Sequence, residues 1–309
     1  MKYQSVAILG AGAVGSYIIW GLTKKKNIDL CVVASGERKA RYEKDGFFIN
    51  DKRYDPVVKT PKEAYGVDLL IVATKYNALR PALKDIQAVV GERTTVISLM
   101  NGVDSEEIIS EVVSPDKIVH SLIKVASERD GNHVKFDPET TIGIVYGEAD
   151  LSRGTERVEA LNDLFADTGL HYRATDVILT EIWSKFRLNV PNNQAQAMVG
   201  CGVGAYRDSE HMAFLRDRLR EEVDLIAKAK EIDFGKSDTS STFGSKVMDR
   251  ARYSTLQDLD AKRHTEVDMF AGAIIRMGKE LGIPTPYNEF TYHMIKALEE
   301  KNDGKFDYK

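Results

Sequence analysis

The stretch "SVAILGAGAVG" at residues 5–15 decides the fold of the first half of the chain. Its apolar start is typical of a buried parallel strand, and the residues that follow it have the pattern of a helix. Between the two, Gly10 permits a tight turn, Gly12 lets a pyrophosphate approach the backbone, and Gly15 allows the helix to pack closely on the strand. The unpaired N–H groups at the start of such a helix favour an anion. The pattern predicts a dinucleotide-binding turn made of Gly10, Ala11, Gly12, Ala13, Val14 and Gly15.

The rest of the first half alternates between short apolar runs and helical patterns. Runs at 29–34, 67–74 and 94–99 suit further parallel strands, and helical patterns at 13–25 and 77–90 lie between strands. This alternation predicts a doubly wound α/β sheet of the Rossmann type, with right-handed crossovers.

Two segments interrupt the alternation and are typical of antiparallel hairpins. Residues 46–58 have the pattern of a hairpin that turns at Asn50 and Asp51. A second β-rich segment is expected at 117–147, with a turn at 129–132.

Long helical patterns replace the strands after about residue 176. The chain is therefore predicted to comprise a Rossmann-type dinucleotide-binding domain at 1–175 and an all-α substrate and catalytic domain at 176–309. A break is expected at 282–286, before the last helix. The expected helices are 177–199, 209–231, 239–252, 261–281 and 287–301.

Composition excludes several classes of protein. A net charge of -4 does not favour binding to nucleic acid or to an anionic membrane, and the uncharged run at 5–22 is too rich in glycine to span one. The histidines show no metal-ligand spacing, so no metal site is expected. Cys31 and Cys201 form no disulfide framework, which indicates a reducing, cytoplasmic location.

The choice of dinucleotide depends on the end of the second strand. About 20 residues after Gly15, where an acidic residue would bind the ribose of NAD, the chain has Ser35. Glu37 is near, but Arg38 and Lys39 follow it directly. A hydroxyl and two cations suit a 2′-phosphate, which favours NADP, although solvated helix charges would give the same pattern.

Polar residues follow two other predicted strands. Lys75 comes directly after the strand at 67–74, and Asn101 follows the strand at 94–99. Each alone is explained by a solvated lysine or a turn-forming asparagine. Because both fall at the carboxyl ends of parallel strands, where ligands bind in such sheets, a functional role is the favoured interpretation.

A line of polar residues crosses an apolar helix in "IWSKFRLNVPNN" at 182–193. Lys185, Asn189 and Asn193 recur every four residues and so lie on one helix face. Two interpretations are open: a substrate-binding face, or a solvated lysine with two asparagines that satisfy backbone groups around a kink at Pro191.

Five motifs, in order and spacing, resemble the ketopantoate reductase (2-dehydropantoate 2-reductase) family. They are "GAGAVG", "TKYN", "MNG", "WSKFRLNVPNN" and "STLQDLDAKRHTEVD", and the resemblance runs from Val6 to about Leu298. The family resemblance implies NADPH-dependent reduction of ketopantoate to pantoate, in the route to pantothenate and coenzyme A. A small 2-oxo acid is the implied partner, with a homodimer as a candidate assembly.

The resemblance also implies a role for each matching residue. Lys185 would donate a proton to the substrate, and Glu266 would hydrogen-bond near the reacting hydroxyl and the cofactor ribose. By itself, a carboxylate in the helical pattern around Glu266 is more typical of a solvated or salt-bridged residue. The other implied contacts are Asn189, Asn193 and Ser254 to substrate, Asn101 to nicotinamide or substrate, and Lys75 and Ser127 to cofactor.

Three positions depart from the family pattern. Ser35, Val203 and Ala271 stand where the best-known members have an arginine and two asparagines. The proton-transfer residues are retained, but the outer substrate contacts differ. Two alternatives therefore stay open: a dehydrogenase of another small 2-oxo or hydroxy acid, and a non-catalytic dinucleotide-sensing protein on the same fold.

Overall fold

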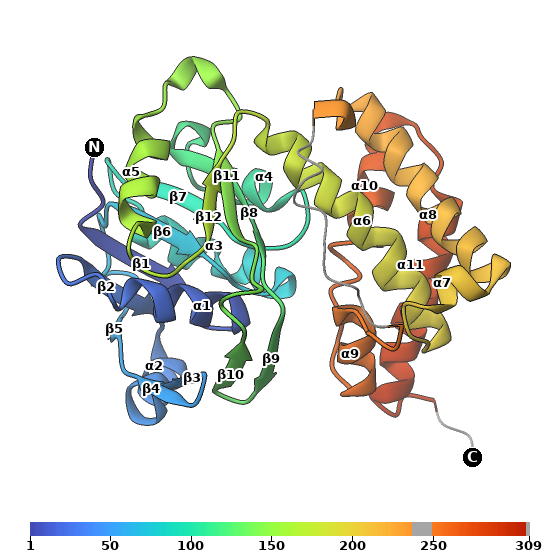
Figure 1. Cartoon of the computed structure of the whole chain (residues 1–309), viewed down its shortest axis with the longest axis horizontal. Helices are drawn as coiled ribbons and strands as arrows, with labels where there is room; N and C mark the ends of the chain where they lie inside the picture. The colour runs from blue at the N-terminus through green and yellow to red at the C-terminus, as the bar shows by residue number, and fades with distance from the viewer. Residues whose placement is uncertain (237–248, 307–309) are drawn as a thin grey trace. The chain divides into compact units, whose positions relative to one another are not determined.

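The computed structural model describes residues 1–236 and 249–306. The chain divides into two compact units, Met1–Leu179 and Thr180–Lys309 (Figure 1). The first contains both β-sheets, and the described part of the second is built from helices and turns, so the predicted fold class is confirmed. Most of the helix expected at 239–252 lies outside the described residues.

An eight-stranded sheet forms the centre of the first unit, in the order β12-β11-β8-β7-β6-β1-β2-β5. Because β1 lies between β2 and β6, the strand order reverses there, which makes the carboxyl end of β1 a switch point. The pairs from β5 to β8 are parallel, as predicted for β1, β2, β6 and β7, whereas β11 runs antiparallel to β8. The strands are β1 Ser5–Leu9, β2 Asp29–Val33, β5 Val57–Lys59, β6 Leu69–Val72, β7 Thr95–Ser98, β8 Ile118–Lys124, β11 Gly143–Gly147 and β12 Tyr172–Ala174.

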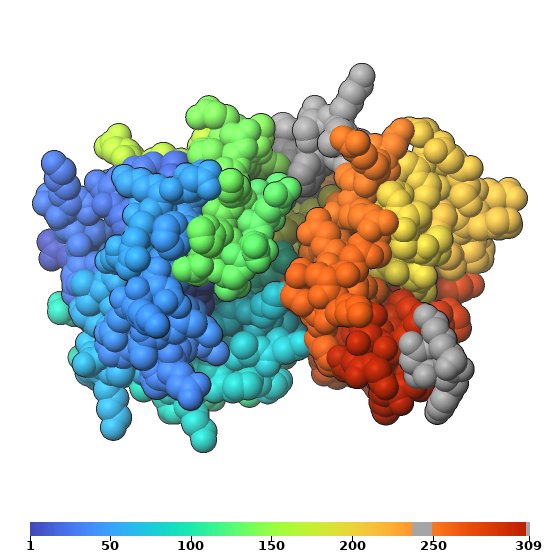
Figure 2. All heavy atoms as spheres, turned by 90° about the horizontal axis from the view of Figure 1, so that it is seen from below, coloured from blue at the N-terminus to red at the C-terminus, as the bar shows by residue number. Residues whose placement is uncertain are grey.

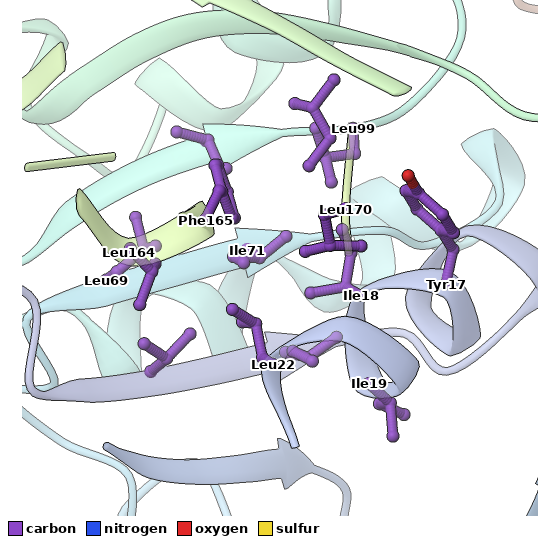
Figure 3. Packing of buried hydrophobic residues seen from close by; sticks show 14 of the residues in the cluster. Tyr17, Ile18, Ile19, Leu22, Leu69, Ile71, Leu99, Leu164, Phe165 and Leu170 are labelled. Carbon is purple, nitrogen blue, oxygen red and sulfur yellow. The ribbon is translucent and has the colours of Figure 1, made fainter. Parts of the chain in front are cut away.

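Helices cover both faces of this sheet. On one face, Ile8 of β1 belongs to the same buried cluster as Tyr17 of α1 and Phe165 of α5. Figure 3 shows Tyr17 and Phe165 within this cluster. On the other face, Ala7 belongs to a cluster with Leu79 of α3. Burying a large apolar side chain contributes about 1.5–3 kcal/mol, so both faces stabilise the sheet. The helices are α1 Ala13–Leu22, α2 Gly36–Asp45, α3 Tyr76–Val89, α4 Ser105–Ser110 and α5 Glu156–Phe165.

A second, four-stranded sheet in the order β4-β3-β10-β9 contains both expected hairpins. Asn50 and Asp51 have φ of 47° and 63°, the left-handed pair that a two-residue turn between antiparallel strands requires. Phe136 of β10 contacts Tyr17 of α1 edge to face, with ring centroids 5.1 Å apart. Figure 2 shows the two hairpins side by side on the face seen from below. The strands are β3 Phe47–Ile49, β4 Lys52–Tyr54, β9 Ser127–Asp130 and β10 His133–Phe136.

Long helices dominate the described part of the second unit, and three of them, α6, α8 and α11, lie close to the predicted ranges. None of the helices in residues 1–236 and 249–306 is both long and apolar enough to cross a membrane. The helices are α6 Ile178–Val199, α7 Ala205–Asp208, α8 Glu210–Ala229, α9 Ser254–Asp260, α10 Ala271–Leu281 and α11 Pro286–Asn302.

The break predicted before the last helix is confirmed. Gly282 ends α10 in the left-handed conformation, with φ of 69°, and Pro286 begins α11. The buried Glu222 carboxylate accepts hydrogen bonds from the N–H groups of Tyr287 and Asn288, at 2.8 and 2.9 Å. A negative charge at a helix N-terminus is stabilising, so Glu222 fixes the start of α11.

The helix predicted at 261–281 is wrong for its first ten residues, because α10 begins only at Ala271. Lys262 adopts a left-handed φ of 52°, which an α-helix cannot contain. The Thr265 N–H donates to Glu299 Oε1 of α11 at 2.6 Å instead of bonding within a helix. Tertiary hydrogen bonds therefore override the helical pattern at 261–270, and Glu266 lies in a turn.

Candidate active site

The glycine turn between β1 and α1 leaves no room for a side chain at two positions. Gly10 has φ of +102°, and a Cβ atom there would lie 2.6 Å from the Ala73 carbonyl oxygen. A Cβ atom at Gly15 would lie 2.1 Å from the Gly10 carbonyl oxygen, so helix and strand could not approach this closely. Gly12 precedes the first residue of α1, and among the described residues not adjacent to it in the chain, only Arg129 comes within 4 Å of the position of its missing side chain. The turn therefore has the geometry of a pyrophosphate cradle, while cofactor binding to its six residues stays a prediction.

The end of β2 presents Ser35 and Arg38 to solvent at the start of α2. The neighbouring Lys39 is already engaged: its Nζ donates to the Val58 carbonyl at 2.5 Å and pairs with Glu43 at 3.0 Å. Arg38 forms no ion pair with any residue of the described chain. Of the two cations considered for a 2′-phosphate, Arg38 is thus the one that can turn to a ligand.

The loops that follow β6 and β7 carry the predicted cofactor residues Lys75 and Asn101. Lys75 is exposed directly before α3, and Asn101 is half-buried in the loop before α4. Tyr76 Oη donates to Asp104 Oδ2 at 2.7 Å, which joins the two loops. Gly102 has φ of 97°, so the turn after Asn101 requires glycine. The structure thus brings the loops of Lys75 and Asn101 together.

A buried polar network lies beside the Asn101 loop, and sequence reasoning missed it. Ser105 Oγ donates to Glu106 Oε2 at 2.6 Å and lies 2.8 Å from Ser98 Oγ. Because the single Ser105 hydroxyl hydrogen is used on Glu106, Ser98 donates to Ser105. Ser121 Oγ donates to the Ser98 carbonyl at 2.7 Å. The network fixes the loop between Ser98 and Ser105 at both ends.

Helix α6 continues through Pro191 and carries all three residues of the predicted polar line. Asn193 is only 3% exposed, and its amide nitrogen donates to the Asn189 carbonyl at 3.0 Å. Asn192 likewise donates to the Leu188 carbonyl at 2.8 Å. The side chains of two asparagines beside the proline therefore bind carbonyls of the preceding helical turn.

Asn193 also meets the predicted carboxylate-binding residue. Ser254, the first residue of α9, donates from Oγ to Asn193 Oδ1 at 3.1 Å. The side chains of Asn193 and Ser254, 61 positions apart, therefore come together. Lys185 and Asn189 lie on α6 and are both half-buried.

Glu266 is half-buried in the turn before α10, and its carbonyl accepts the N–H of Met269 at 3.0 Å. Ala271 is fully buried, and its N–H donates to Gln194 Oε1 of α6 at 3.1 Å. Val203 is half-buried, with its N–H bonded to the Ala251 carbonyl. Both departures from the family pattern therefore fit the local packing of this chain.

Metal-ligating side chains do not cluster in the described residues, and the Cys31 thiol is buried. No group of three or more metal-ligating side chains occurs in residues 1–236 and 249–306. Burial raises the pKa of the Cys31 thiol to about 11, so it stays protonated and unreactive near neutral pH.

Comparison with known proteins identifies the family. Residues 6–147 match the family model described as ketopantoate reductase PanE/ApbA, and residues 177–299 match the model of its C-terminal part. The chain is 28% identical to the 2-dehydropantoate 2-reductase of Aquifex aeolicus over 306 residues, which cover 94% of this chain and 96% of that protein.

Solved structures share the whole fold. A PanE/ApbA family ketopantoate reductase from Ralstonia eutropha superposes with a TM-score of 0.82 at 24% identity, over 97% of this chain and 99% of that one. A D-mandelate dehydrogenase in complex with NADH and anilino(oxo)acetate gives 0.81 at 24% identity, with the same coverage. At 24% sequence identity, these two similarities establish the fold and nothing further. The two matched halves show that the chain belongs to the ketopantoate reductase family of dinucleotide-binding oxidoreductases.

Proposed function

We propose that this protein reduces 2-dehydropantoate (ketopantoate) to pantoate with NADPH, a step towards pantothenate and coenzyme A. The observation that carries the proposal is the match of both halves of the chain to the ketopantoate reductase family models. The hydrogen bond between Ser254 and Asn193 supports it, because it joins two of the residues expected to hold the substrate.

The glycine turn and the α2 start fit a nicotinamide dinucleotide. Gly12 leaves the N-terminus of α1 open to a pyrophosphate, and Arg38 offers a cation to a 2′-phosphate. When bound, the reduced nicotinamide would supply a hydride to the carbonyl carbon of the 2-oxo acid. The carbonyl oxygen then becomes negative and must gain a proton.

Lys185 is the residue that we assign to this proton. Its ammonium group would stabilise the developing negative charge and protonate the oxygen, which completes the hydroxyl of the product. Asn189 and Asn193 would orient the polar groups of the substrate without adding charge. Ser254 would bind the substrate carboxylate, and Glu266 would hydrogen-bond the hydroxyl and the cofactor ribose.

A dehydrogenase of another small 2-oxo or hydroxy acid is the second candidate. Val203 and the buried Ala271 favour it, because both replace asparagines of the family pattern. The non-catalytic dinucleotide sensor is less favoured, since such a protein has no need of Lys185, Ser254 and both asparagines. We further propose a cytoplasmic enzyme, since both cysteines are free thiols. A homodimer remains the candidate assembly.

We expect purified protein to oxidise NADPH with ketopantoate at least about tenfold more efficiently, in kcat/KM, than with pyruvate, 2-oxoisovalerate or benzoylformate. A difference of one hydroxyl or methylene group between two substrates changes the binding energy of the transition state, and with it kcat/KM, by about 1–3 kcal/mol. The measurement is the loss of NADPH absorbance. A preference for another acid would establish the second candidate, and tight NADPH binding without any turnover would establish the sensor.

Cofactor choice is tested at Arg38. We expect Arg38→Ala to raise the KM for NADPH by about tenfold or more, because a charge-assisted hydrogen bond contributes about 1.5–3 kcal/mol. The KM for NADH should change by less than about twofold, since NADH has no 2′-phosphate. Arg41→Ala, which removes an exposed arginine from the same helix, is the matched control. Equal losses with both cofactors in Arg38→Ala would mean that the 2′-phosphate binds elsewhere.

A further inference from the structure

Arg129 of β9 faces helix α1, as the pairing of β9 with β10 shows. In this antiparallel pair, Arg129 is opposite Val134, and Ser127 is opposite Phe136. Val134 and Phe136 are buried in the core cluster that contains Tyr17 of α1. Cross-strand partners project from the same face of a sheet, so Arg129 projects towards α1.

Its acidic neighbours project the other way. Glu128 is opposite Lys135, and Asp130 is opposite His133, all four of which are exposed. Arg129 forms no ion pair with any other side chain in the described part of the protein. Its guanidinium charge is therefore not neutralised from within the hairpin.

The guanidinium lies beside the glycine turn. A Cβ atom added at Gly12 would lie 3.4 Å from Arg129 Nη1, the nearest atom to it among the described residues apart from those next to Gly12 in the chain. Arg129 Nε donates to the Gly131 carbonyl at 2.9 Å, which orients the side chain and leaves its two terminal nitrogens for other acceptors. A cation thus stands at the position where the backbone is open to a ligand.

The hairpin that carries Arg129 is fixed on the same helix that begins at this turn. The Phe136 ring contacts the Tyr17 ring at 5.1 Å and the Trp20 ring at 5.5 Å, both edge to face. These contacts are with side chains on α1, the helix whose N–H groups point towards Gly12. The position of the hairpin backbone beside the turn is therefore set by this aromatic packing.

We propose that Arg129 is a cofactor-binding residue that clamps the dinucleotide pyrophosphate against the Gly12 backbone. The inference rests on the proposed function, in that it requires a bound nicotinamide dinucleotide. A planar guanidinium binds phosphate oxygens with two parallel hydrogen bonds, and the start of α1 attracts the same anion from the other side. Because the pyrophosphate is common to NADPH and NADH, Arg129 increases affinity for both, whereas Arg38 acts on NADPH.

The test is a titration of full-length protein with NADPH and, separately, with NADH. We expect Arg129→Gln to raise both Kd values by a similar factor of about tenfold or more, the loss typical of a charge-assisted contact. Arg129→Lys, which keeps the charge without the fork, should give intermediate Kd values. Lys135→Gln removes a cation from the outer face of the same hairpin and should leave both values within about twofold of the parent.

Each other outcome overturns a specific statement. Unchanged Kd values in Arg129→Gln would remove Arg129 from the cofactor site. A loss with NADPH only would place it at the 2′-phosphate and overturn the pyrophosphate contact. An equal loss in Arg129→Lys and Arg129→Gln, accompanied by equally lowered melting temperatures, would reduce its role to holding the hairpin. If the parent protein binds neither dinucleotide, the proposed function itself fails, which the parent titration reports before any variant is measured.

Discussion

Lys185→Ala lowers kcat with the preferred 2-oxo acid by at least about 100-fold, the amount that a positioned general acid contributes. The variant loses both the proton and the positive charge that oppose negative charge on the substrate oxygen. Because this charge develops mainly in the transition state, we expect KM to change much less than kcat. Steady-state kinetics at saturating NADPH measure both constants.

A second variant separates the loss of the proton from the loss of the positive charge, and a third serves as a control. Lys185→Arg keeps a positive charge but cannot give up a proton near neutral pH, so its kcat should stay well below that of the parent protein. Lys228→Ala, at an exposed position of α8, is the control for loss of a lysine and should leave kcat unchanged. A kcat for Lys185→Ala within threefold of the parent value would assign the proton to another group.

We expect Gly15→Ala to lower the stability of the protein, whereas Gly12→Ala should leave stability unchanged and weaken NADPH binding. A Cβ atom at Gly15 would lie 2.1 Å from the Gly10 carbonyl oxygen, a backbone atom that cannot move aside. Overpacking of this kind costs about 3 kcal/mol, so Gly15→Ala should lower the melting temperature by roughly 5 °C or more.

At Gly12 the nearest atom to an added Cβ would be the flexible Arg129 Nη1, at 3.4 Å, and the residue has an ordinary φ of -81°. Gly12→Ala should therefore fold normally but bind NADPH more weakly, since a methyl group would occupy the space of the pyrophosphate. Thermal melting and NADPH titration of both variants measure the two effects. Unchanged NADPH affinity in a normally folded Gly12→Ala would mean that the pyrophosphate does not cross this turn.

Local patterns in the sequence were sufficient for most of the fold. The strand–turn–helix at residues 5–15 and the hairpin at Asn50 and Asp51 follow from apolar periodicity and from residues that tolerate a left-handed backbone. The helix expected at 261–281 is wrong for residues 261–270 because Glu299, more than 30 positions away, accepts the hydrogen bond of the Thr265 N–H. The antiparallel direction of β11 also depends on its partner β8, which periodicity does not identify.

The candidate site was predictable only where a motif fixed it. The glycine spacing and the strand-end positions of Lys75 and Asn101 could be identified from sequence, and their binding roles stay predictions. The hydrogen bonds that join Ser98, Ser105 and Glu106 could not, because serines have no signal that separates a buried network from a turn. Arg129 was missed for a related reason, since the face it occupies depends on cross-strand register.

Helix α1 packs against both sheets, and this packing has a consequence for ligand binding. The helix is locked to β1 through Gly15, and Tyr17 and Trp20 on it support the small sheet. The small sheet could separate from it only by exposing these rings to water, which is costly. The glycine turn and the small sheet beside it are therefore held together before any ligand binds, so a dinucleotide that bound there as proposed would cost little conformational entropy.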